Sequence, residues 1–166
     1  MTFVNDKVIG KIGEGVVKEL IEDVYGHKVV DVSEDAEWQK VDVDFLVDGF
    51  QVEVKTDTSK TPNIFFETVS NKEKNTPGCM LVTTADFLYY VHLGHNFILT
   101  IPLENYRIWV LDIQDELREV NVRTSKAVGL LVPLKRLFDE VEGVGTMSID
   151  YMKLSQEQIL ERVGAL

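Results

Sequence analysis

Residues 41–55 read Val-Asp-Val-Asp-Phe-Leu-Val-Asp-Gly-Phe-Gln-Val-Glu-Val-Lys, and this stretch decides the fold. Two runs of alternating polar and apolar residues, 41–47 and 50–55, flank Asp48-Gly49. Asp-Gly between alternating runs is the strongest short-range signal for a β-hairpin. A two-residue turn there places Asp44 opposite Glu53 on the neighbouring strand, and Asp42 opposite Lys55.

The two faces of this hairpin differ in chemistry, because successive side chains of a strand point to opposite faces. One face is wholly apolar and is expected to pack on the core: Val43, Phe45, Val47, Phe50, Val52 and Val54. The other face is expected to be open to solvent and gathers three carboxylates and one ammonium among Asp42, Asp44, Leu46, Gln51, Glu53 and Lys55.

The opposed carboxylates of Asp44 and Glu53 indicate a cation site, since like charges directly opposed destabilise a sheet. Hard divalent cations prefer carboxylate oxygens, and Mg²⁺ uses one or two of them and keeps several waters. We therefore expect Mg²⁺, with Mn²⁺ as a substitute. Lys55 projects from the same face, where an ammonium can orient an attacking water or neutralise charge that develops on a phosphate.

The same residues resemble the signature of the PD-(D/E)XK, or restriction-endonuclease-like, nuclease superfamily, over about residues 8–110. Val43 occupies the position of the motif's Pro, which varies within the family. The resemblance implies an α/β fold with a restriction-endonuclease-like core, a mixed β-sheet flanked by helices. It implies that Asp44 and Glu53 hold the metal and that Lys55 assists catalysis. A Glu on the preceding helix often joins the metal in this family, and Glu14 matches that pattern.

The rest of the chain supplies the elements of such a fold, and their order indicates an α/β sandwich with a mixed sheet. We expect one domain over residues 1–166, with the nuclease core in residues 1–110 and an extension in residues 111–166. Helices are predicted from Asn5 or Asp6 to Gly26, from Pro102 to Glu119, over 133–141 and after Ser155; strands are predicted over 27–32, 63–69, 87–91, 97–101 and 128–132. Gly10, Gly13 and Gly15 favour close packing of the first helix on the sheet.

The distribution of charge along the sequence indicates which residues could contact DNA. The net charge of −11 is unusual for a nucleic-acid binder, because phosphate contacts dominate affinity. Residues 55–74 are nevertheless locally basic, so Lys60, Lys72 and Lys74, with Asn63, are the expected DNA contacts. Asp42 and Glu67 are expected to contact the catalytic residues without ligating the metal, with Asp42 as a partner of Lys55.

Composition narrows the remaining alternatives. The single cysteine, Cys79, fits a reducing cytoplasm and is expected in the core, and no apolar run is long enough for a membrane span. The leading hypothesis is a DNA endonuclease of phage or host recombination or repair, with a homodimer expected by analogy to Holliday-junction resolvases. Two alternatives stay open: an inactive nuclease-fold module whose acidic surface binds a protein, and a structural metal-binding domain.

Overall fold

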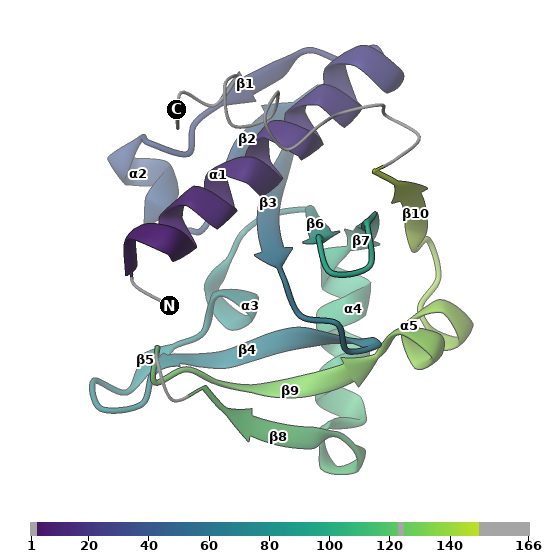
Figure 1. Cartoon of the computed structure of the whole chain (residues 1–166). Helices are drawn as coiled ribbons and strands as arrows, with labels where there is room; N and C mark the ends of the chain where they lie inside the picture. The colour runs from purple at the N-terminus through teal and green to yellow at the C-terminus, as the bar shows by residue number, and fades with distance from the viewer. Residues whose placement is uncertain (1–2, 123–124, 150–166) are drawn as a thin grey trace.

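The computed structural model describes residues 3–122 and 125–149, which form a mixed α/β architecture (Figure 1). Within these residues, one sheet has six strands in the order β1-β2-β3-β6-β7-β10, and a second has four in the order β5-β4-β9-β8. In the first sheet β3 and β6 run parallel and the other neighbours antiparallel, whereas the second sheet is antiparallel throughout. The predicted mixed sheet flanked by helices is therefore confirmed, but a second sheet accompanies it.

The elements have the following bounds. The strands of the first sheet are β1 Val29–Asp31, β2 Phe45–Val47, β3 Phe50–Asp57, β6 Phe87–His92, β7 Phe97–Pro102 and β10 Gly145–Ser148. The strands of the second are β4 Asn63–Asn71, β5 Thr76–Pro77, β8 Arg118–Asn121 and β9 Val128–Pro133. The helices are α1 Phe3–Glu19 with a π-turn η1 Leu20–Val24, α2 Ala36–Gln39, α3 Cys79–Val82, α4 Leu103–Asp112, the 3₁₀ turn η2 Gln114–Glu116 and α5 Leu134–Glu140.

Helix α1 covers one face of the first sheet, where it packs on β3 and β6 (Figure 1). Its apolar residues recur at helical spacing and are buried against the sheet, forming a core that includes Ile12, Val16, Val17, Leu20, Phe45, Val52, Val54 and Val91. Gly26 follows the helix with φ +75°, the left-handed conformation in which glycine commonly ends a helix. The predicted end of this helix is confirmed, although the helix begins at Phe3.

A second core fills the space between the other face of the first sheet, the inner face of the second sheet and α4. Its members include Val43, Ile64, Phe66, Leu88, Tyr90, Leu99, Tyr106, Val110, Leu130 and Val132. Cys79 belongs to this core, as expected, and is 6% exposed. Glu53 and Lys55 on the polar face of the hairpin line a cavity that residues of β4 also line.

Two predicted elements are wrong in extent. The strand expected over 41–47 is only β2, because Asp42 adopts φ 47° and a loop with the short helix α2 precedes it. The helix expected from Pro102 to Glu119 ends at Asp112, and residues 118–121 pair with β9 instead. Pairing with a distant strand overrode local propensity in the second case.

The strand predicted over 63–69 exists as β4, but it lies in the second sheet and does not extend the hairpin's sheet. Its neighbours are β5 and β9, with Phe65 opposite Leu131 and Glu67 opposite Gly129. The helix predicted after Ser155 lies outside the described residues. In the part of the chain that the structure describes, no helix combines the length and apolar character needed to cross a bilayer.

Candidate active site

The hairpin of β2 and β3 has the register that its Asp-Gly turn predicts, with Phe45 opposite Val52 and Leu46 opposite Gln51. Strand β2 starts only at Phe45, so its backbone hydrogen bonds to β3 would also start at Phe45. The Asp44 side chain extends this pairing: the backbone N–H of Val54 donates to Asp44 Oδ2 at 2.8 Å. The Asp44 backbone N–H also donates to Val52 O at 2.9 Å. Two hydrogen bonds therefore hold Asp44 against β3, one through its carboxylate and one through its backbone.

Glu53 and Lys55 form a close ion pair on β3, with Lys55 Nζ 2.5 Å from Glu53 Oε1. Glu53 is only 3% exposed, which corrects the expectation of a solvent-facing strand surface. Burial raises the pKa of Glu53 to about 8, with Lys55 opposing that rise and Asp44 adding to it. Burial alone would lower the pKa of Lys55, but Glu53, Cys79 and Asp42 together hold that pKa above its usual value.

Asp44 and Glu53 line the same cavity, and each carboxyl group affects the pKa of the other. Burial raises the pKa of Asp44, while the hydrogen bond from Val54 and the charge of Lys55 lower it. Two neighbouring carboxyl groups repel when both are ionised, and a bound proton or cation relieves that repulsion. This pair is the geometric centre of the candidate site.

Glu14 joins the same neighbourhood from α1. Gly13 brings this helix close to β3, because a Cβ at position 13 would lie 1.8 Å from Thr56 Oγ1. Lys11 Nζ lies 2.7 Å from Glu14 Oε2 and 3.0 Å from Glu34 Oε1. Burial raises the pKa of Glu14, and the Asp44 carboxylate raises it further. The close packing predicted for Gly13 is confirmed, whereas a Cβ at Gly10 would meet no atom within 4 Å.

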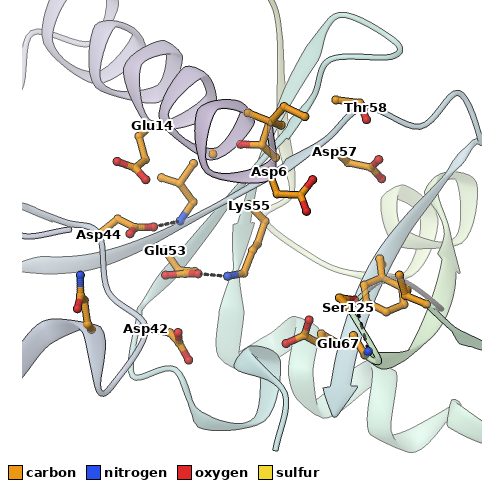
Figure 2. A pocket seen from close by; sticks show the side chains of 18 of the residues that line it. Asp6, Glu14, Asp42, Asp44, Glu53, Lys55, Asp57, Thr58, Glu67 and Ser125 are labelled. Atoms are coloured by element: carbon orange, nitrogen blue, oxygen red, sulfur yellow. Dashed lines mark hydrogen bonds and ion pairs between the residues drawn. The ribbon is translucent and has the colours of Figure 1, made fainter. Parts of the chain in front are cut away.

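All four candidate residues line one cavity of about 790 Å³ between α1, β3 and the second sheet. Figure 2 shows Asp44, Glu53 and Lys55 on one side of this cavity and Glu67 and Ser125 on the other. Among the described residues that line it, seven are carboxylates and one is a lysine: Asp6, Glu14, Asp42, Asp44, Glu53, Asp57, Glu67 and Lys55. The described lining of the cavity is therefore strongly acidic, and Lys55 is its single lysine.

The two supporting residues lie elsewhere than expected. Asp42 does not oppose Lys55 in the ladder, because its left-handed φ of 47° turns the chain before β2 begins. It still lines the cavity, and its charge raises the pKa of both Glu53 and Lys55. Glu67 reaches the cavity from the second sheet, where Glu67 Oε1 accepts a hydrogen bond from the backbone N–H of Cys79 at 3.2 Å.

The structure does not bring the expected DNA contacts into this cavity. Lys60, Asn63, Lys72 and Lys74 are all absent from its lining. Lys72 instead borders a neighbouring cavity of about 420 Å³, and its Nζ lies 3.3 Å from Asn121 Oδ1.

Sequence reasoning missed several lining residues, above all Asp57. Asp57 continues the alternation of Glu53 and Lys55 along β3, and this spacing could have identified it. Its Oδ2 accepts a hydrogen bond from the Tyr90 hydroxyl at 2.8 Å. Tyr90 lies opposite Lys55 in the parallel pairing of β3 with β6, which no local pattern predicts. Asp6, Thr58 and Ser125 also line the cavity and carry no recognisable local signal.

The donor set fits a cation that needs few protein ligands. Within residues 3–122 and 125–149, no three His, Cys, Asp or Glu side chains converge as a metal cage would require. Mg²⁺ does not require such a cage, since one or two carboxylates and several waters satisfy it. Asp44 and Glu53, which line the same roomy cavity, can supply those carboxylates.

No protein-family model matches this chain, and a search of curated proteins finds no match either.

Proposed function

We propose that this protein is a metal-dependent nuclease of the PD-(D/E)XK type that hydrolyses DNA phosphodiester bonds. The observation that carries the proposal is that half-buried Asp44, buried Glu53 and Lys55 line one large cavity, with Lys55 Nζ 2.5 Å from Glu53 Oε1. The mixed sheet with its hairpin supports the restriction-endonuclease-like core that the motif resembles.

In this proposal Asp44 and Glu53 hold Mg²⁺, and Glu14 stands nearby as a third carboxylate. The ion would polarise the scissile phosphate and lower the pKa of a bound water, which is the chemistry that such ions supply. Asp44 is suited to its part because the hydrogen bond from Val54 fixes one carboxylate oxygen. The other oxygen can then take a ligand without a further change in the backbone.

Lys55 has two tasks in the proposed reaction. Its ammonium contacts Glu53 before substrate binds, and it would then donate hydrogen bonds to the attacking water or to a phosphate oxygen. Glu53, Cys79 and Asp42 together hold the Lys55 pKa above its usual value, so Lys55 stays protonated at neutral pH and acts as a donor, not as a base. Stabilising charge that develops on the phosphate is the larger contribution expected of such a group.

The decisive experiment incubates the protein with plasmid, branched and single-stranded DNA in Mg²⁺, in Mn²⁺ and in EDTA. Cleavage of at least one substrate is expected with either metal and none in EDTA. Lys55→Ala is the matched negative variant, because it removes the ammonium and leaves both carboxylates. Absence of cleavage of every substrate in both metals overturns the nuclease proposal.

A second candidate is a non-catalytic module that binds a basic protein segment in the same cavity. The ratio of seven carboxylates to one lysine among the described lining residues favours it. Opposite charges across an interface steer association and set specificity. If this candidate is correct, Lys55→Ala should bind the partner as well as or better than the wild type. No metal-dependent cleavage of DNA should then be observed.

A further inference from the structure

The second sheet has one face that packs in the core and one that does not. Its inner side chains, including Ile64, Phe66, Leu130 and Val132, are buried beneath α4. Register and alternation assign the opposite side chains to a common face, called here the outer face: Asn63, Phe65 and Glu67 on β4, Gly129 and Leu131 on β9, and Arg118 and Val120 on β8. Arg118 is exposed, and apart from Gly129 the others are half-buried.

The side chain of Phe65 lies on the outer face and covers Gly129. A Cβ at Gly129 would lie 2.6 Å from Phe65 Cζ, so the ring occupies the space that a side chain on β9 would need. The ring therefore leans across the neighbouring strand. Phe65 also borders both the carboxylate cavity and a second cavity of about 270 Å³ beside Lys55. An aromatic ring is thus presented within the space that leads to the candidate active site.

Charge distinguishes this sheet from the rest of the chain. Counted on the sequence, residues 63–77 and 117–133 carry five basic and three acidic residues, a net charge of +2, in a chain with a net charge of −11. The tips of its two hairpins are joined, because the Lys72 backbone N–H donates to Lys126 O at 3.0 Å. Both lysines border the cavity of about 420 Å³, which shares Val122 and Ala127 with the carboxylate cavity.

We propose that the outer face of the second sheet binds a single strand of DNA and leads it to the carboxylate cavity, with one base stacked on Phe65. Arg118 contacts the phosphate backbone on the sheet, and Lys72 and Lys126 contact it at the hairpin tips. This inference rests on the proposed nuclease function, and it names the form of substrate that the site accepts. Charge complementarity and continuity with the candidate active site support it.

A single strand fits the outer face better than a duplex does. A duplex keeps its base faces stacked inside, whereas an unpaired strand offers them to an aromatic side chain. Stacking tolerates any base, so no sequence preference follows from Phe65 alone. The few cations near the path give a shallow dependence of affinity on salt.

The test measures binding of fluorescein-labelled 20-nucleotide oligo(dT) by fluorescence anisotropy, in Ca²⁺ to avoid cleavage. Phe65→Leu keeps an apolar side chain but removes the aromatic face, and a rise in Kd of about tenfold is expected. Phe65→Tyr keeps the ring and should bind as the wild type does. Phe50→Leu is the matched control, because Phe50 is a 52% exposed phenylalanine at the far end of the hairpin.

The lysine contacts have a separate readout in the salt dependence. Combined Lys72→Gln and Lys126→Gln should lower the slope of log Kd against log salt by about 1.4, the value for two phosphate contacts on a single strand. Combined Lys28→Gln and Lys135→Gln removes the same charge from exposed positions outside the second sheet and should leave the slope within about 0.4 of the wild-type value.

Three results would overturn the inference: no binding of oligo(dT), an unchanged Kd for Phe65→Leu, or equal competition by duplex DNA of the same length. Cleavage assays with Mn²⁺ keep the two proposals apart. Binding through Phe65 without cleavage of any DNA would contradict the nuclease function and support single-strand binding on the outer face. Cleavage by Phe65→Leu with unchanged binding would contradict single-strand binding on Phe65 and support the nuclease function.

Discussion

Lys55 Nζ lies 2.5 Å from Glu53 Oε1, although the two residues are next-nearest neighbours on one strand. Their side chains share a face of β3, so the Lys55 ammonium can contact the Glu53 carboxyl group two residues before it. This arrangement places an ammonium against a carboxyl group that is only 3% exposed. It also places a cation beside the carboxyl groups on which the proposed chemistry depends.

Lys55→Ala should retain metal binding and lose the chemical step, because an ammonium does not ligate a cation. Titration calorimetry should give a Mg²⁺ or Mn²⁺ affinity within about tenfold of wild type, roughly 1.4 kcal/mol. Lys60→Ala, at an exposed lysine outside the cavity lining, serves as the control and should cleave normally. A wild-type cleavage rate in Lys55→Ala would remove Lys55 from the proposed mechanism.

Asp44→Asn and Glu53→Gln should each abolish metal-dependent cleavage and keep the fold. In Asp44→Asn the side-chain carbonyl can still accept the hydrogen bond from Val54, so the end of β2 stays attached to β3. In metal-free buffer at pH 8 both variants should melt at or above the wild-type temperature, since the repulsion between the carboxylates is removed. A melting temperature several degrees lower in both would assign the two carboxylates a structural role.

The metal-free protein should lose stability as pH rises from 5 to 8.5. Burial raises the folded-state pKa of Glu53 to about 8, above its value of 4.5 in an unfolded chain. The folded state therefore binds the proton more tightly, and its contribution is complete below pH 4.5 and lost as pH rises through 8. The loss should be on the order of 3 kcal/mol in urea unfolding with EDTA present. Glu53→Gln should flatten this profile, and an unchanged profile would contradict the assignment.

Gly13→Ala should destabilise the protein by about 1–3 kcal/mol, because the new Cβ would meet Thr56 Oγ1 and push α1 away from β3. Gly10→Ala is the matched control on the same helix, where a Cβ meets no atom within 4 Å. It should stabilise by up to about 1 kcal/mol through helix propensity. Urea unfolding measures both variants. Thr56→Ala combined with Gly13→Ala should recover part of the loss, and strict additivity would show that the two sites do not touch.

The sequence alone determined the hairpin and its register. The Asp48-Gly49 turn sets which residues of β2 and β3 face each other, and alternation then sets which side chains share a face. The helical spacing of apolar residues in α1 and the glycine at position 26 likewise determined where that helix lies and ends. These features depend on interactions among near neighbours, so a local pattern contains the information.

Only the tertiary structure decided the surroundings of that hairpin. The burial of Glu53, the position of Glu67 across the cavity and the contact of Asp57 with Tyr90 all depend on segments distant in the chain. Residues 118–121 form a strand only because β9 offers a partner, and β4 joins a second sheet for the same reason. Pairing between distant strands is chosen by packing of the whole chain, and the free energy of that packing is not encoded in any single stretch of sequence.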